Sequence, residues 1–440
     1  MMLGGVVICL ATFVILVVLL RRDGVSLGLP ISYLGSLLLI HVPGAIAHLF
    51  DKNNVLVQQR PFTEVGISLT ALGAVCFVAG VALANLRKDP VMPRAANRTT
   101  FARFCLIGGA AATVLSFMFV FPSIRAIIER GGLIWMLAIV VGLRGAVLRG
   151  DRVATWRWLG VLILYPVLML IFGGFLSYGV AAMITVLAAV VVVARSGIRV
   201  AIACVVASVI GISVFLSYFE NRTEIRGAVW GGAPVETRVG VSLDAFRQIK
   251  LFNPANEEHL VAINARLNQN YFAGLAATRI SNGDAQYLHG RTIWEGFLAI
   301  IPRVFWPDKT IVAGSGTIVA EMTGLQLSRS TSFGVGNVME FQINFGIPGI
   351  VIGFLLLGFL LRRLDRKATE SYEAGELGNS ILYYLPAVAM IQPNGSMVEV
   401  IGGAVAALIA AYGWRWAWTR WPKPLSASIA SAPQMARTFR

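Results

Sequence analysis

The sequence predicts an all-α membrane protein, a polytopic bundle of about eleven transmembrane helices that carries one large outer loop. Of its 440 residues, 57% are apolar and only 13% are charged, and apolar runs of about 18 residues or more recur along the chain. Runs of this length are far too long for barrel strands, and helices pair their own backbone groups within lipid. One polar stretch, residues 219–345, interrupts the pattern, and we expect it to form the outer loop, with short and interfacial helices inside it.

Eight apolar runs precede this polar stretch and three follow it. The first run has no basic residue before it, has Arg21 and Arg22 after it and lacks a small-residue cleavage site, so we interpret it as a retained anchor. The runs predict transmembrane helices 1 to 8 within 1–218, helices 9 to 11 within 346–418, and a basic tail over 419–440. The eleven runs are 2–20, 26–50, 65–86, 104–122, 131–148, 158–175, 178–194, 199–218, 346–361, 377–391 and 397–414.

The distribution of Lys and Arg predicts the orientation. The segments that follow the odd-numbered runs together carry the whole net charge of +15, whereas bases and acids balance in the remaining segments, the long loop included. By the positive-inside rule, the N-terminus and the long loop are outside and the C-terminus is cytoplasmic. The basic character therefore reflects membrane topology, and no nucleic-acid partner is expected.

Two runs test this count of spans. Arg144 lies within the fifth run, near its cytoplasmic end, where its side chain can extend to the headgroups. The tenth run is short and contains Pro386, so a re-entrant segment is an alternative there. If it did not cross, the basic tail from Arg415 onward would lie outside, which the charge rule disfavours.

Cysteines, histidines and short motifs give no sign of a metal or cofactor. The four cysteines fall in four different runs, which argues against a disulfide framework or a thiolate site. The histidines show no ligand spacing of the HExxH kind, and there is no P-loop, dinucleotide fingerprint or nucleophile elbow. We therefore expect neither a metal nor a cofactor.

The long loop has internal order. Apolar residues recur at helical spacing over 244–252 and 257–271, and Asn282-Gly283 marks a turn before a second block. In that block Trp294, Phe297, Leu298 and Ile301 would form one apolar stripe. Such a stripe is typical of a helix in the membrane interface, and Trp306-Pro307 would end it at headgroup depth.

Four arginines, Arg266, Arg279, Arg291 and Arg303, recur in this loop at intervals of about a dozen residues. Guanidinium groups suit planar, multi-donor binding of phosphate, and at a membrane surface they would meet a lipid-linked phosphate or pyrophosphate. The alternative is that they pair with the carboxylates of the loop and with ordinary lipid headgroups.

The segment from Arg266 to Gly346 resembles the Wzy-type oligosaccharide repeat-unit polymerases, which extend O-antigen, capsule or exopolysaccharide chains at the outer face of the bacterial inner membrane. The resemblance rests on Tyr271, Arg279, the 301–309 run and the 340–346 stretch, together with the eleven-span layout. Arg279 and Gly290 are also spaced like an Arg-x10-Gly pattern of that family. No second Arg-x10-Gly pattern follows Arg125 or Arg130, so a two-loop mechanism of substrate capture is in doubt for this chain.

The resemblance implies a metal-independent membrane glycosyltransferase. The donor would be a growing glycan on undecaprenyl pyrophosphate, and the acceptor a sugar hydroxyl of an incoming lipid-linked repeat unit. Besides these lipid substrates and the bilayer, a chain-length regulator and a flippase would be partners. The protein would lie in the bacterial inner membrane with its N-terminus periplasmic and its C-terminus cytoplasmic.

Within this hypothesis, arginines would stabilise the leaving pyrophosphate and a carboxylate or imidazole would act as general base. We name Arg279, Arg303 and Glu340 as catalytic, with Asp284, Glu295 and His289 as other candidates for the base. Each candidate is equally interpretable as a surface ion-pair partner. The predicted substrate-binding residues are Arg266, Tyr271, His289, Arg291, Glu295, Lys309, Asn394 and Glu399, the last two from a polar mouth over 392–399 that is equally interpretable as a tight turn.

Two other functions remain open. A ligase of the O-antigen type would use the same donor but transfer to a lipid A core sugar, and it would depend on a histidine such as His259 or His289. A transporter or flippase would be expected to show internal repeats and acidic residues deep in a span, which the sequence lacks. His41 and His48, two turns apart in the second run, are expected to form hydrogen bonds in the core, with a lipid-tail or proton path as the alternative.

Overall fold

The computed structural model describes residues 1–86, 94, 96–116, 118–119, 121–174, 176–194, 196–247, 249, 251–301, 306, 316–326 and 334–422, and within them all regular structure is helical. Arg303 and Lys309, two of the predicted site residues, lie outside these ranges, as does the tail from residue 423 onward. The N-terminal helices are α1 (Met2–Asp23), α2 (Leu29–Phe50), η1 (Val57–Gln59), α3 (Arg60–Ala84), α4 (Arg98–Ser116), α5 (Pro122–Gly132), α6 (Ile134–Arg149), α7 (Arg152–Leu168), η2 (Met169–Gly173) and α8 (Ser177–Val193).

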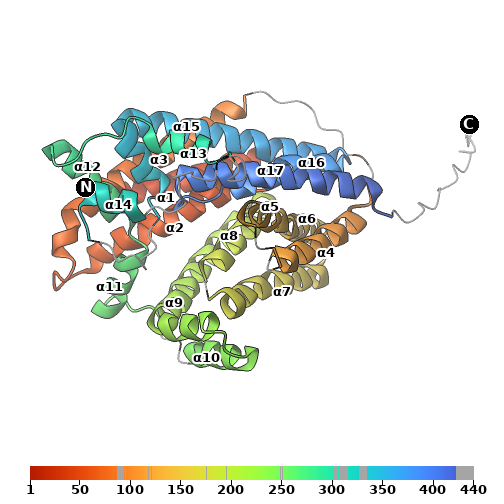
Figure 1. The fold of residues 1–440 in the computed structure, drawn as a ribbon, viewed down its shortest axis with the longest axis horizontal. Coiled ribbons are helices and arrows are strands. Elements are labelled where there is room, and N and C mark those ends of the chain that lie inside the picture. The colour runs from red at the N-terminus through yellow and green to blue at the C-terminus, as the bar shows by residue number, and fades with distance from the viewer. Residues whose placement is uncertain are drawn as a thin grey trace, which may run out of the picture.

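The C-terminal half contains the longest helices. In the described part of the chain, five short helices lie one after another between the two longest, within residues 235–323 (Figure 1). These elements are α9 (Gly197–Trp230), α10 (Val235–Arg247), α11 (Glu257–Arg266), α12 (Gln269–Asn282), α13 (Arg291–Leu298), α14 (Gly316–Thr323), α15 (Asn337–Glu373), α16 (Leu377–Ala389) and α17 (Met397–Arg420).

Each of the eleven predicted runs corresponds to a helix. Among the described residues, nine helices are long and apolar enough to cross a membrane, which is what a multi-pass membrane protein requires. The seventh and tenth runs form the shorter helices α8, of 17 residues, and α16, of 13 residues. The helical bundle is therefore confirmed, while the count of eleven spans stays a prediction.

The predicted limits of the long loop do not coincide with helix ends. Helix α9 continues for 34 residues, to Trp230, and α15 begins at Asn337. Within α15 the backbone breaks at Gly346, whose φ of 64° and ψ of −148° are not helical. A glycine allows this conformation without steric cost, and Tyr287 lies directly against it. The nine residues before Gly346 therefore form a short helix of their own, which precedes the predicted ninth span.

Two helices expected within the loop differ from the structure. Helix α10 ends at Arg247, so the helix predicted over 244–252 is confirmed for its first four residues and wrong at residues 249, 251 and 252, while 248 and 250 lie outside the described residues. The helix predicted over 257–271 is broken into α11 and α12, because Asn268 lies between them in a non-helical conformation. The predicted turn at Asn282-Gly283 is confirmed, since Gly283 ends α12 with a left-handed φ of 83°.

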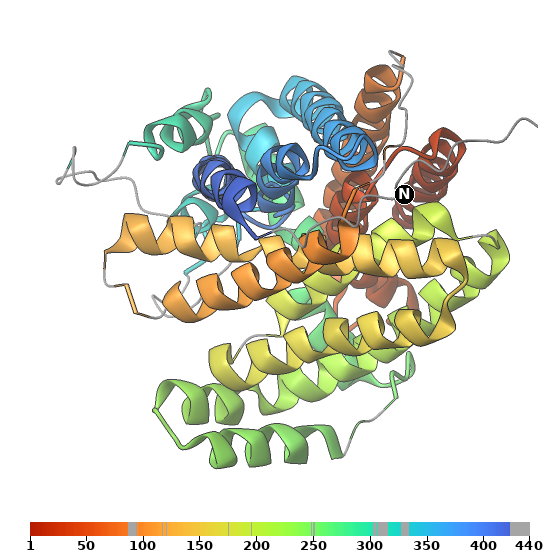
Figure 2. The same ribbon diagram turned by 90° about the vertical axis from the view of Figure 1, so that its right-hand side faces the viewer.

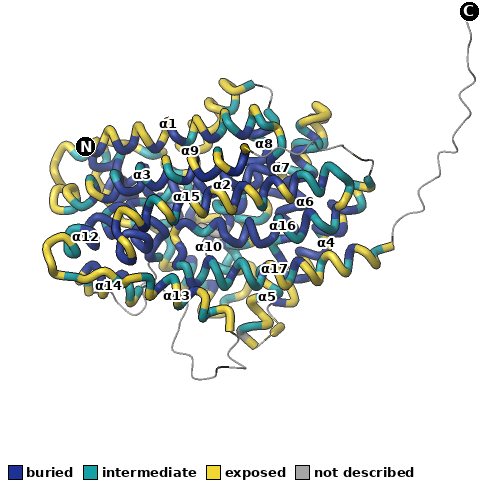
Figure 3. Tube along the Cα trace, turned by 90° about the horizontal axis from the view of Figure 1, so that it is seen from above, coloured by how far each residue is buried: buried dark blue, intermediate teal, exposed yellow. Residues whose placement is uncertain are grey.

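The core of the bundle forms around α3, which packs against α15, α12 and α1 (Figure 3). Glycines allow the closest approaches. A methyl group added at Gly80 would lie 2.1 Å from the carbonyl oxygen of Leu355 in α15, and one added at Gly358 would lie 2.1 Å from that of Phe77. Without a side chain at these positions the two backbones come into direct contact, as is common between membrane helices.

Helix α12 packs in the same way on the first half of α3. A methyl group added at Gly274 would lie 1.8 Å from the carbonyl oxygen of Phe62, and one at Gly66 would lie 2.0 Å from that of Asn270. The α11–α12 corner also contacts α2, where the amide of Gly44 donates to the carbonyl of Leu267 at 2.9 Å. This part of the predicted outer loop is therefore inserted against the membrane helices rather than separated from them.

Buried polar side chains accompany this insertion. His41 Nδ1 lies 2.7 Å from Asn270 Oδ1, and His48 Nε2 lies 2.9 Å from Asn264 Oδ1. Asn268 connects the two pairs, donating to Asn264 Oδ1 at 2.7 Å and accepting from Asn270 Nδ2 at 3.2 Å. The expectation that both histidines form hydrogen bonds in the core is confirmed, and their partners come from the α11–α12 corner.

Buried charges fix the opposite end of the bundle. The guanidinium of Arg362 is 0% exposed and pairs with Asp365 at 2.7 Å and with Asp23, while its Nε donates to Asn85. Asp365 in turn accepts from the backbone amide of Leu27, so the connection between α1 and α2 is fastened to α15. Removing one member of such a buried pair would leave an uncompensated charge.

Arg144 belongs to a second group at that end. Its guanidinium is buried and donates to Glu373 at 2.5 Å, and Glu373 also pairs with Arg98 at 3.0 Å. The expectation that Arg144 extends to the headgroups is therefore wrong. Sequence position alone does not show this, because Glu373 lies more than 200 residues away.

Candidate functional site

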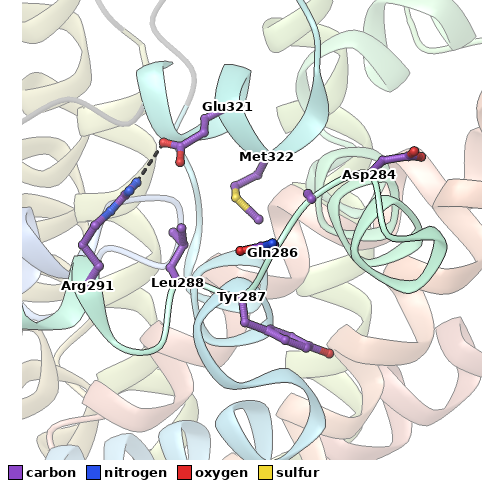
Figure 4. A pocket seen from close by; sticks show the side chains of 8 residues that line it. Asp284, Gln286, Tyr287, Leu288, Arg291, Glu321 and Met322 are labelled. Carbon is purple, nitrogen blue, oxygen red and sulfur yellow. Dashed lines mark hydrogen bonds and ion pairs between the residues drawn. The ribbon is translucent and has the colours of Figure 1, made fainter.

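A cavity of about 420 Å³ lies where the segment after α12 faces α14. The first wall comes from residues 284–288 and Arg291, and the second from Glu321 and Met322 (Figure 4). Figure 1 shows α12 and α14 at the end of the molecule where the N-terminus lies, opposite the C-terminal end of α17. The lining residues are Asp284, Ala285, Gln286, Tyr287, Leu288, Arg291, Glu321 and Met322.

A compact turn positions the first wall. The amide of Leu288 donates to the carbonyl of Ile343 at 2.8 Å, and the amide of Gly290 donates to Asn344 Oδ1 at 3.0 Å, so α15 fixes the segment. His289 and Gly290 both have positive φ, 47° and 88°, which reverses the chain just before α13 begins at Arg291. His289 is exposed beside the cavity.

Helix α13 presents an apolar face outward. Trp294 is 63% exposed and Phe297 is 52% exposed, whereas Thr292 and Gly296 on the other face are buried. Gly296 lies against Met397 at the start of α17. The predicted apolar stripe is therefore present and uncovered, although the helix ends at Leu298, earlier than Trp306.

Arg291 forms an ion pair across the cavity. Its Nη2 lies 2.8 Å from Glu321 Oε2 on α14, and its Nε lies 4.0 Å from Glu295 Oε1 one turn along α13 (Figure 4). The hydrogen bond to Glu321 raises the pKa of Arg291 above its ordinary value, so the group stays charged. Glu321 was missed from the sequence, because nothing there places α14 opposite α13.

Arg279 contacts both walls without meeting a carboxylate among the described residues. Its Nη1 lies 3.5 Å from the carbonyl of Met322, and its Nη2 lies 3.4 Å from the carbonyl of Asp284. These are long contacts to neutral acceptors, and no carboxylate in the described part of the chain forms an ion pair with this guanidinium. Gly324, with φ of 71°, ends α14 directly against this guanidinium.

Glu340 is enclosed rather than open to the cavity. Its side chain is 0% exposed, and Oε2 accepts from the amide of Met397 at 2.7 Å, where a helix start favours a carboxylate. Its Oε1 has no hydrogen-bond partner among the described residues. Asn344, one turn later, donates to Thr292 Oγ1 at 2.7 Å, so α13 covers this region.

The predicted polar mouth forms the cap of α17. Ser396 and Glu399 make a capping box, in which the Ser396 amide donates to Glu399 Oε2 at 2.9 Å and Ser396 Oγ accepts from the Glu399 amide. Asn394 is exposed in the turn before it. Glu399 is thus engaged by its own helix, as in the tight-turn interpretation of this sequence.

Three predicted residues lie away from the cavity lining. The guanidinium of Arg266 lies at the end of α11, 5.7 Å from the centre of the Phe219 ring. Tyr271 packs edge-on to Phe62, with ring centres 6.0 Å apart. His259 is buried, and its Nδ1 accepts from the amide of Asn253 at 3.2 Å.

Chemically, the cavity is lined by one paired arginine and two carboxylates, Asp284 and Glu321. Arg279 is not a lining residue, but its guanidinium contacts the backbone of both walls, and an exposed apolar helix lies beside the cavity. Such a site can bind an anionic, polar ligand that remains attached to a lipid. The described residues include no group of three or more His, Cys, Asp or Glu side chains that could bind a metal ion. No family model, curated protein or solved structure matches the chain.

Proposed function

We propose that the protein is a bacterial inner-membrane glycosyltransferase that polymerises undecaprenyl-pyrophosphate-linked oligosaccharide repeat units at the periplasmic face. The growing glycan is transferred from its lipid carrier to a sugar hydroxyl of an incoming lipid-linked unit. The observation that carries the proposal is the uncompensated guanidinium of Arg279 at a polar cavity, beside a helix with an exposed apolar face.

The reaction needs positive charge where the leaving group departs. The bond between the anomeric carbon and a pyrophosphate oxygen breaks, the acceptor oxygen bonds to that carbon, and undecaprenyl pyrophosphate leaves with the added negative charge. Arg291 lines the cavity and Arg279 lies behind its walls, so the new charge would develop near two guanidinium groups that are already placed. No metal is required in this scheme.

The acceptor hydroxyl also has to lose a proton to a base. Of the two carboxylates that line the cavity, Glu321 is engaged by Arg291 at 2.8 Å, so its oxygens are less available to a substrate hydroxyl. Asp284 makes no ion pair with a described residue, and in Figure 4 it lies at the edge of the cavity with its carboxylate directed away from the other lining side chains, so it would have to rotate toward the substrate. We therefore assign the base to Asp284, in preference to the enclosed Glu340.

The surroundings of the cavity suit a substrate on a lipid. Trp294 and Phe297 of α13 are exposed and are typical of an interfacial helix. The cavity lies at the end of the bundle that also contains the N-terminus, and the charge distribution predicts that end to be outside. A chain-length regulator and a flippase are the expected partners in the membrane.

A ligase that transfers the same donor to a lipid A core sugar is the second candidate. The observation in its favour is His289, which is exposed in the turn at the cavity with a left-handed φ of 47°. Side chains in that conformation are uncommon outside Gly and Asn and are often functional. A His289→Ala variant that still makes long chains would favour the polymerase over the ligase.

The test uses the source bacterium with this gene deleted and complemented by variants. We expect Arg279→Ala to leave only single-repeat glycan, because the developing pyrophosphate charge loses its unpaired cation. Glycan length is measured on gels and protein abundance by immunoblot.

The matched control is Arg247→Ala. Arg247 lies in the same predicted loop, but it is highly exposed and pairs with Asp244 on its own helix. This variant should make chains of normal length. Long chains from Arg279→Ala at normal abundance would contradict the proposal.

A further inference from the structure

A cluster of three arginines lies where α9 leaves its apolar stretch, away from the cavity. The guanidinium carbon of Arg222 lies 4.2 Å from the centre of the Phe219 ring, and that of Arg266 lies 5.7 Å from the same centre. Arg226, one helical turn after Arg222, donates to the hydroxyl of Tyr218 at 3.1 Å. We call Arg222, Arg226 and Arg266 the arginine cluster.

Neither Glu220 nor Glu224 of α9 lies on the helix face that carries Arg222 and Arg226. Arg222 and Arg226 are four residues apart and share one face of α9, whereas Glu220 and Glu224 are two residues removed and lie on the opposite face. Like charges four residues apart destabilise a helix. Arg222 makes no hydrogen bond or ion pair with a described residue, and its guanidinium lies over the Phe219 ring.

Arg266 adds a third positive charge from a different helix. Burial lowers the pKa of Arg266 below its ordinary value, and the charges of Arg222 and Arg226 lower it further. The three groups are thus near enough to repel one another while partly shielded from water. A bound anion would relieve this repulsion, and guanidinium groups suit the oxygens of a phosphate.

The depth of the cluster indicates where that anion comes from. The α9 residues from Ala201 to Gly211 are exposed on every side of the helix, and they are almost entirely apolar. A hydrocarbon core of about 30 Å is spanned by about 20 helical residues, which the apolar run 199–218 supplies. Arg222 therefore lies about one turn beyond the hydrocarbon, at the depth of lipid phosphates.

The residues around the arginine cluster are also typical of the membrane–water interface. Trp230, two turns further along α9, is 62% exposed, and the guanidinium of Arg226 lies 5.4 Å from its ring centre. Tryptophan is enriched at the interface between membrane and water. In Figures 1 and 2, α9 and α10 lie at the edge of the molecule farthest from α15 to α17, so this region is open to surrounding lipid.

We propose that the arginine cluster binds the phosphate group of an anionic membrane lipid at the outer interface. The site would tie the α9–α11 corner to the headgroup layer, next to the α11–α12 insertion that positions Arg279. This proposal does not depend on the proposed function, because the lipid is a ligand of the fold and not a reactant.

The test measures lipid binding to the purified full-length protein in a neutral detergent. Native mass spectrometry would titrate dioleoyl-phosphatidylglycerol, with dioleoyl-phosphatidylcholine and free inorganic phosphate in parallel. We expect tight binding of phosphatidylglycerol alone. In Arg222→Ala, binding should weaken by about tenfold, as expected for loss of one charge-assisted hydrogen bond.

Folding is controlled within the same experiment. Arg222 makes no hydrogen bond or ion pair with a described residue, so its replacement should leave the melting temperature unchanged, and Arg247→Ala removes an equally basic but more exposed residue. Equal phosphatidylglycerol affinity in Arg222→Ala, Arg266→Ala and the parent protein would overturn the proposal. Inorganic phosphate that binds as tightly as the lipid would also overturn it, because the ligand would then be a soluble anion.

Discussion

At the residue scale, Arg279 and Arg291 differ in what balances their charge. Arg291 meets Glu321 at 2.8 Å, whereas the partners of Arg279 among the described residues are the carbonyls of Met322 and Asp284. A paired guanidinium gains little by binding a further anion, but an unpaired one at a partly enclosed cavity gains more. This difference makes Arg279 the residue on which the proposed chemistry depends most.

A matched pair of amide variants distinguishes the two candidates for the general base, Asp284 and Glu340. Asp284→Asn should lower glycan polymerisation about a hundredfold or more, since it removes a general base. Glu340→Gln should leave chain length near normal, because the amide oxygen still accepts from the amide of Met397. The measurement is glycan length at equal protein abundance, and the reverse pattern would assign the base to Glu340.

Sequence reasoning identified residues at the cavity but not their pairing. Arg279, Arg291 and the turn at Asn282-Gly283 were predicted, because arginine spacing and Asn-Gly signals are local, whereas the turn at His289-Gly290 before α13 was not. Glu321 and Met322 were missed, since their role depends on α14 facing a turn more than 30 residues earlier in the chain. Glu340 and Glu399 were predicted by residue type, although helix-capping contacts account for their observed surroundings.

At the element scale, the packing of α12 on α3 determines where Arg279 lies. The contact at Gly274 and Gly66 brings the two backbones together, and the His41–Asn270 pair fixes the neighbouring end of α12. Arg279 lies in the last turn of α12 and is thereby positioned against α14. A shift of α12 would therefore move the cavity wall as well as the core.

Gly274→Ala tests this contact. The added methyl group would lie 1.8 Å from the carbonyl oxygen of Phe62, so α12 has to move, at a cost of about 1–3 kcal/mol. We expect a lower melting temperature in detergent and shorter glycan. Gly240→Ala in α10 is the control, because nothing lies within 4 Å of a methyl group there. Equal melting of the two variants would show that α12 does not pack directly on α3.

The apolar runs were sufficient to predict every membrane-spanning candidate, because hydrophobicity over about 18 residues is a local property. They were not sufficient to predict the insertion of α11 and α12. That insertion depends on Gly66 and Gly274, and a glycine in a sequence does not reveal which backbone approaches it. The same limit applies to α9, whose 34 residues continue past the end of its apolar run.

At the scale of the whole molecule, the two ends of the bundle have different character. One end contains the cavity and the arginine cluster, and the other contains the buried pairs of Arg362 with Asp365 and Arg144 with Glu373. The excess positive charge of the chain lies in the segments predicted to be cytoplasmic, so the proposed site and the excess charge are expected on opposite sides of the membrane.

This orientation predicts which positions a membrane-impermeant thiol reagent reaches. In a cysteine-free background, Ser281→Cys at the end of α12 should react in intact cells, stripped of outer membrane where one is present. Thr419→Cys at the end of α17 should react only after the inner membrane is permeabilised. Both positions are exposed and tolerate a small side chain. Labelling of Thr419→Cys in intact cells would reverse the predicted topology.

The most direct measurement of the central claim uses the purified full-length protein, reconstituted into liposomes with a synthetic undecaprenyl-pyrophosphate-linked repeat unit. The product is separated by chain length, and released undecaprenyl pyrophosphate is counted in the same sample. We predict glycans of several repeats, with one carrier released for each new linkage, and neither product from Arg279→Ala. No elongation by the parent protein, or equal elongation by Arg279→Ala, would contradict the account.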